Sequence, residues 1–143
     1  MTSLCLADQR IRDSGAIAIY RSLAPSNVRT LNFKGNELTD HSCLVLGEIL
    51  AQNPKLEKID LSRNEIGDEG ACAVAAGITR NSKLQALNLA YNQIDDAGLD
   101  ALTKVGARLA KNIVVLFLIF PCFRVAAEYG VEFRVEDAAH NLQ

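Results

Sequence analysis

Residues 59–70 read IDLSRNEIGDEG, and a closely similar stretch, LNLAYNQIDDAG, follows at 87–98. The stretch 31–42, LNFKGNELTDHS, is a third copy, and LCLADQRIRDSG at 4–15 is a weaker fourth. Self-similarity at a fixed period of about 20–50 residues is typical of a solenoid, in which each unit packs only against its neighbours. The repeat therefore predicts a stack of similar units.

Each unit begins with a short segment in which apolar and variable residues alternate, which indicates a strand with one buried face. A polar turn and an apolar anchor follow, and then a run with helical period. We expect the inward residues of two helices to be Leu44, Leu46, Ile49 and Leu50 in the second unit, and Cys72, Val74, Ala75 and Ile78 in the third.

A connection from one strand through a helix to a parallel strand is nearly always right-handed, so successive units are expected to lie side by side. Helices are wider than strands, and the stack must curve toward the strands. The predicted fold is a right-handed α/β solenoid, with a parallel sheet on the concave face and helices on the convex face.

The consensus LxxLxLxxNxIxDxGxxxLAxxLxxN resembles the leucine-rich repeat in its long, ribonuclease-inhibitor-like subtype, with a period of about 28 residues. The resemblance covers 4–112 and implies four repeats within 1–112 that form a horseshoe arc. Gln9 departs from the asparagine of the pattern, and Ser42 departs from its glycine.

The period is lost after Ala101, and 113–143 is interpreted as a degenerate last repeat and C-terminal cap. Its strand uses either Leu116 and Leu118 or Leu118 and Phe120, and both registers remain open. The segment 113–120, IVVLFLIF, is apolar on both faces of any strand. We expect the C-terminal tail to cover it; self-association through this edge, or a foreign partner, is the alternative.

Asparagine recurs in the turn at Asn36, Asn64 and Asn92. Its side chain supplies both a donor and an acceptor, so stacked units are predicted to form a ladder that satisfies buried backbone groups. Aspartate recurs after the anchor at 13, 40, 68 and 96. We expect each aspartate to cap its helix or to act as a first-turn acid rather than to bind calcium.

In this interpretation the side chains of the variable strand residues are not part of the core and face the concave surface. Tyrosine and arginine are enriched at interface hot spots. The candidate partner-binding residues are Asn32, Lys34, Asp60, Arg63, Asn88 and Tyr91.

The formal net charge of −2 gives no support to nucleic-acid or membrane binding. Cys5, Cys43, Cys72 and Cys122 form no CxxC pair, which indicates free, mostly buried thiols in a reducing compartment. No signal-peptide pattern occurs, and 113–120 is too short to span a membrane. We therefore expect a cytoplasmic protein.

No catalytic constellation or phosphate-binding loop is present, so the sequence predicts no enzyme activity, no metal and no cofactor. The predicted function is a module that binds a protein partner through the concave sheet. Two alternatives differ in class: an assembly element, which self-associates through 113–120 or forms part of a longer array, and a regulator of a small GTPase. The last follows from the resemblance alone, because relatives of this subtype bind very different targets.

Overall fold

Strands and helices alternate along the whole described chain. The computed structural model describes residues 3–23, 25–52, 55–81, 83–108 and 115–117. The elements in order are β1 (Ser3–Cys5), α1 (Arg12–Ser22), β2 (Thr30–Asn32), α2 (Asp40–Gln52), β3 (Lys58–Asp60), α3 (Asp68–Thr79), β4 (Ala86–Asn88), α4 (Asp96–Arg108) and β5 (Val115–Phe117).

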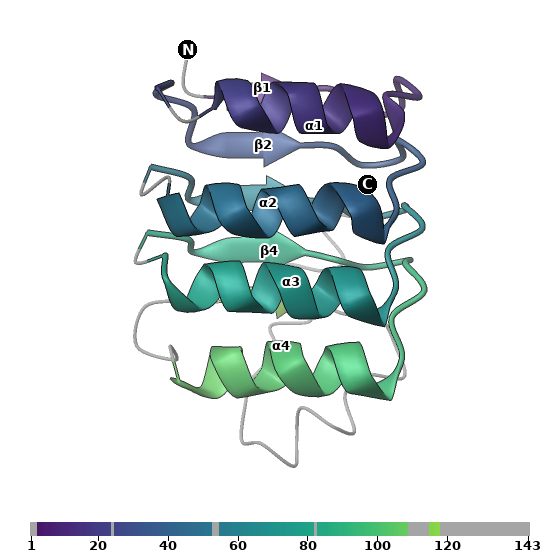
Figure 1. The fold of residues 1–143 in the computed structure, drawn as a ribbon, viewed down its shortest axis with the longest axis vertical. Coiled ribbons are helices and arrows are strands. Elements are labelled where there is room, and N and C mark those ends of the chain that lie inside the picture. Colours follow the sequence, from purple (N-terminus) through teal and green to yellow (C-terminus); the bar gives the residue numbers. More distant parts are fainter. Residues whose placement is uncertain (1–2, 24, 53–54, 82, 109–114, 118–143) are drawn as a thin grey trace.

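The five strands form one parallel sheet in the order β1-β2-β3-β4-β5. Figure 1 shows the four helices stacked side by side in chain order, in one layer against the sheet. Pairing between neighbouring strands places one apolar residue of every strand in a single row: Leu4, Leu31, Ile59, Leu87 and Leu116. The fold is the predicted α/β solenoid, and equivalent residues of neighbouring units lie next to one another.

The pairing of β5 distinguishes between the two registers that the sequence left open. Leu116 pairs with Leu87, so it occupies the first apolar position of the strand. Only Val115–Phe117 of the predicted cap is described, and the remainder of 113–143 lies outside the described residues.

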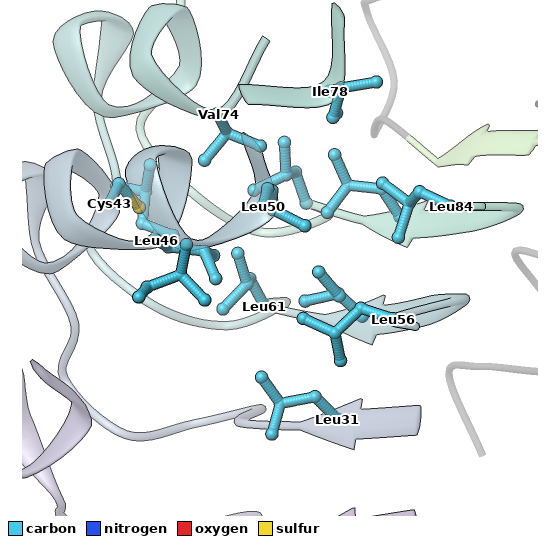
Figure 2. Packing of buried hydrophobic residues seen from close by; sticks show 14 of the residues in the cluster. Leu31, Cys43, Leu46, Leu50, Leu56, Leu61, Val74, Ile78 and Leu84 are labelled. Carbon is cyan, nitrogen blue, oxygen red and sulfur yellow. The ribbon is translucent and has the colours of Figure 1, made fainter. Parts of the chain in front are cut away.

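The core lies between the sheet and the helix layer. Figure 2 shows leucines of the strand side, among them Leu31 and Leu61, facing Leu46, Leu50 and Val74 of the helices. Each of these side chains is fully buried. One column from every unit thus packs against the corresponding column of the next, as expected for a solenoid.

The predicted inward faces of α2 and α3 are wrong at one position each. Leu44 is 42 % exposed, and Cys72 is also exposed. The buried row instead runs through Cys43, Leu46 and Leu50 in α2. A helix turns by about 100° per residue, so the residue that follows Cys43 points away from the core.

Two glycines let α2 and α3 approach closely. A Cβ atom at Gly77 would lie 2.4 Å from the carbonyl oxygen of Gly47, and a Cβ at Gly47 would lie 2.4 Å from the carbonyl oxygen of Ala73. Real Cβ atoms do not come so near to backbone oxygen, so the spacing of these two helices depends on glycine at both positions.

Candidate functional site

The asparagine column joins each unit to the one before it. The Asn64 side-chain oxygen accepts the N–H groups of Asn36 and Leu38 at 2.9 and 3.0 Å. Its amide nitrogen donates to the carbonyl oxygens of Phe33, Leu61 and Ser62 at 2.9–3.1 Å.

Asn36 and Asn92 repeat this arrangement. The oxygen of Asn36 accepts from Gln9 and Ile11 in the first unit, and the oxygen of Asn92 accepts from Ile66 in the third. Each asparagine therefore satisfies backbone of its own unit and of the preceding one, as the ladder idea requires.

The aspartate column joins each unit to the one after it. Asp40 accepts the N–H of Gly67 at 2.6 Å, and Asp68 accepts those of Asp95 and Gly98 at 2.7 and 3.0 Å. Gly67 and Asp95 immediately precede the aspartates of the next unit. These carboxylates therefore hold the N-terminus of the next helix. Asp68 itself is the first residue of α3 and acts as its first-turn acid, and the N-cap position before it is Gly67, which has no side chain to cap the helix.

Asp13 makes the same connection at the first helix. It accepts from both the N–H and the hydroxyl of Thr39. Burial raises the pKa of the Asp13 carboxyl, but hydrogen bonds from Thr39 and Ser42 outweigh burial and hold the pKa below its ordinary value. Each of the four aspartates does lie in the first turn of its own helix, as predicted.

The outward column of Asn32, Asp60 and Asn88 has a structural role that the sequence interpretation missed. The side-chain oxygen of each accepts the N–H two residues further on, at 2.9–3.0 Å. Asp60 also accepts the hydroxyl of Ser62 at 2.6 Å. Asn88 is only 5 % exposed, so little of its side chain is accessible to a partner. The three side chains fix the turn that ends each strand.

Exposed side chains that could contact a partner lie where the strands end. The Arg63 guanidinium carbon lies 4.4 Å from the centroid of the Tyr91 ring, which is a cation–π contact. Tyr91 is 43 % exposed. Lys34, half-buried, lies in the strand-end turn of the adjacent second unit. We call Lys34, Arg63 and Tyr91 the strand-end patch.

The backbone at this edge favours glycine. Asp8, Gly35, Arg63 and Tyr91 occupy equivalent positions in the four units, and their φ angles lie between 56° and 69°. A left-handed conformation costs most residues about 1 kcal/mol or more, and only glycine avoids the cost. Asp8, Arg63 and Tyr91 adopt this conformation without being glycine, as do Arg10, Arg12 and Glu37 elsewhere in the turns.

A hollow lies on the exposed side of the helix layer, between α2 and α3. It is a shallow groove of about 320 Å³ whose lining includes Leu44, Gly47, Glu48, Ala73 and Arg80. Its floor consists of small residues because the two helices approach so closely at the glycines. Its lining has two charged residues, Glu48 and Arg80, as many as the strand-end patch, but no aromatic ring.

The three cysteines of the described residues are free, but the expectation that the cysteines are mostly buried is wrong. Cys5 and Cys72 are exposed and Cys43 is buried, while Cys122 lies outside the described residues. Burial, together with the nearby Asp40 and Asp13 charges, raises the pKa of the Cys43 thiol to about 12. That thiol is a weak nucleophile at neutral pH, since the thiolate is the reactive form.

Within the described ranges, no three histidine, cysteine or acidic side chains converge on a point that could hold a metal ion. No helix among the same residues has the length and apolar character needed to cross a membrane.

A family model described as "Leucine Rich repeat" matches residues 52–75 and 80–102. These two stretches of the chain are similar to leucine-rich repeats. Among solved structures, the repeat fold is similar to leiomodin-1 actin-binding site 2, with a TM-score of 0.75, 14 % identity, and coverage of 100 % of this chain and 86 % of that one. At that identity the likeness shows the fold alone.

Part of this chain is also similar in sequence to a small part of a much longer protein. FERM domain-containing protein C of Dictyostelium discoideum is 32 % identical over 63 residues, which are 43 % of this chain and 4 % of that protein. Because the match spans so little of that relative, its activity as a whole does not transfer to this chain.

Proposed function

We propose that the repeats form a non-enzymatic module that binds a protein partner through the concave sheet face, centred on the strand-end patch. The proposal rests chiefly on the Arg63–Tyr91 pair, which combines an exposed aromatic ring with an exposed guanidinium. Arginine and tyrosine are the residue types that most often carry binding energy in protein interfaces. Nucleic acid, membrane and cofactor have no part in this proposal, which places the protein in the cytoplasm.

The hydrogen bonds reduce the number of candidate partner-binding residues that can be tested by substitution. Asn32, Asp60 and Asn88 hold their own turns, so a substitution there would disturb the fold as well as any contact. Lys34, Arg63 and Tyr91 have no such hydrogen bonds from their side chains among the described residues, and they are the positions to substitute.

The spacing supports the long, ribonuclease-inhibitor-like subtype as part of the proposal. Leu31, Ile59 and Leu87 are equivalent strand residues of the inner units and pair across the sheet. Their spacing of about 28 residues lies at the long end of the range for leucine-rich repeats. It leaves room for a full helix in every unit. Regulation of a small GTPase rests on that resemblance alone and has no residue of this chain to support it.

The test is affinity capture from lysate of the source cell with three baits. These are the wild type, Arg63→Gln/Tyr91→Ala, and the control Arg80→Gln/Leu44→Ala in the groove between α2 and α3. We expect a partner that the wild type and the control retain and the strand-end variant loses, with all three baits melting alike.

Equal recovery by the wild type and the strand-end variant, with loss by the control, would move the site to the groove between α2 and α3. Purified actin is a defined candidate partner to test directly against the three baits, because the leiomodin-1 domain of similar fold is an actin-binding site. Concentration-dependent mass of this chain by itself would instead support the assembly alternative through 113–120.

A further inference from the structure

The concave face of the second to fourth units has a charge opposite in sign to that of the whole chain. The formal net charge of the chain is −2. The outward strand and strand-end positions of these units carry three cations, Lys34, Lys58 and Arg63, and one anion, Asp60, and the first unit adds a second anion, Asp8, whose carboxylate lies beside Gly35. The face is therefore locally positive in a protein that is acidic overall.

Internal hydrogen bonds hold one carboxylate oxygen of Asp60, the anion of these three units. The Asp60 carboxylate accepts both the N–H and the hydroxyl of Ser62, at 2.9 and 2.6 Å. Ion pairs of the described residues join Arg12 to Glu37, Arg29 to Glu57 and Lys104 to Asp100, and none includes a cation of this face. The cations of the concave face are thus left available to an external anion.

The Arg63 guanidinium carbon lies over the Tyr91 ring, 4.4 Å from its centroid. A guanidinium that lies over an aromatic ring keeps its N–H groups, which lie in the guanidinium plane, free for hydrogen bonding. A carboxylate accepts two of those N–H groups in parallel, a geometry that Lys34 can support as a nearby point charge. The exposed Tyr91 ring supplies apolar contact beside it.

We propose that the partner presents an acidic segment to the strand-end patch, in which a carboxylate side chain meets Arg63 and Lys34 and an adjacent apolar residue packs on Tyr91. This inference rests on the proposed function, because it assigns the chemistry of the partner at the same face. Charge complementarity of this kind selects partners and accelerates association.

The test begins with a random-peptide display library selected on the wild-type protein. We expect enriched peptides to share an aspartate or glutamate next to an apolar residue. The affinity of an enriched peptide is then compared with that of its twin in which the acid is replaced by its amide. We expect the amide twin to bind about tenfold more weakly, and the acidic peptide to weaken as salt is added.

Variants of the protein locate the contact. Lys34→Gln and Arg63→Gln should each weaken the acidic peptide several-fold or more but leave the amide twin nearly unchanged. Lys83→Gln removes one exposed positive charge from the opposite edge of the sheet and is the matched control, for which we expect unchanged affinity. A Lys34→Glu protein should recover binding when the acid of the peptide is replaced by lysine.

The outcomes separate this inference from the proposal beneath it. Enriched peptides that are neutral or basic, yet are lost by Tyr91→Ala, would overturn the acidic segment and leave the concave module standing. Acidic peptides that bind Arg63→Gln and Tyr91→Ala as tightly as the wild type would overturn both. A library without enrichment, beside Tyr91-dependent capture of a protein from lysate, would overturn the acidic segment alone.

Discussion

The first and third units follow the same sequence pattern, but their contacts differ. Ile59, Leu61 and Ile66 of the third unit are at most 3 % exposed, whereas the equivalent Leu4, Leu6 and Ile11 of the first are only partly buried. Asn64 makes five hydrogen bonds within the described residues. The side-chain amide nitrogen of Gln9, which stands at the equivalent position, donates to the Ala7 carbonyl oxygen of its own unit at 3.1 Å.

The difference shows that the contribution of a repeat depends on its neighbours as much as on its residues. An inner unit packs on two others, and its polar turn serves both itself and the unit before it. Nearest-neighbour contacts dominate the stability of solenoids for this reason. Substitutions at equivalent positions should therefore differ in effect between the two units.

The largest difference should appear in the asparagine column. Asn64→Ala leaves several buried backbone groups without partners and should lower the free energy of unfolding by about 3 kcal/mol. Gln9→Ala removes one exposed hydrogen bond and should change the free energy of unfolding by less than about 0.5 kcal/mol. Urea denaturation of both variants gives the two values, and equal losses would contradict the comparison.

The next largest difference concerns glycine in the helices. Gly77→Ala places a Cβ against the Gly47 backbone and should cost about 2 kcal/mol, since neither backbone can move aside cheaply. The Cβ of Gly15→Ala would meet only the side chain of Ile11, at 2.7 Å, and that side chain is partly exposed. Alanine also favours the helix by about 1 kcal/mol over glycine, so this variant should be neutral or more stable. Thermal melting distinguishes the two signs.

In the aspartate column the first unit resembles the inner ones, because the Asp13 carboxylate accepts the N–H of Thr39 in the second unit just as Asp40 and Asp68 accept N–H groups of the unit that follows them. The folded pKa of Asp13 lies below its ordinary value of 3.8. Its stabilisation is therefore complete above the unfolded pKa and is lost as pH falls through the folded pKa. Asp13→Asn should cost about 1 kcal/mol at neutral pH and reduce the acid dependence of stability. The urea midpoint of the wild type and of Asp13→Asn is measured against pH. The prediction is contradicted if the two midpoints fall in parallel as the pH is lowered.

The smallest expected effect has the opposite sign. The Tyr20 hydroxyl is fully buried, and it has no hydrogen-bond partner among the described residues. Its ring packs edge-on against Phe33, with centroids 5.3 Å apart, a contact that phenylalanine would retain. Tyr20→Phe should therefore raise stability by up to about 1 kcal/mol. A lower melting temperature would reveal a partner for the hydroxyl, such as a buried water.

Some of these contacts could be anticipated from the sequence, and others could not. The asparagines at 36, 64 and 92 stood out because one side chain type recurs in a turn that must satisfy buried backbone. The reach of Asp40 and Asp68 into the next unit was missed, because helix capping within one unit explains the same residues equally well. The turn role of Asn32, Asp60 and Asn88 was missed because alternation marks a residue as outward without showing what its side chain accepts.

The sequence by itself determined the repeat, the order of strand and helix, and the parallel stacking, because a regular period leaves only one way to bury every apolar column. Tertiary structure decided which side chains connect units and which remain exposed. It turned Leu44 and Cys72 outward, withdrew Asn88 from the open face, and placed Arg63 over Tyr91 from the next unit. These outcomes depend on helix phase and on the distance between units, and the pattern of a single repeat contains neither.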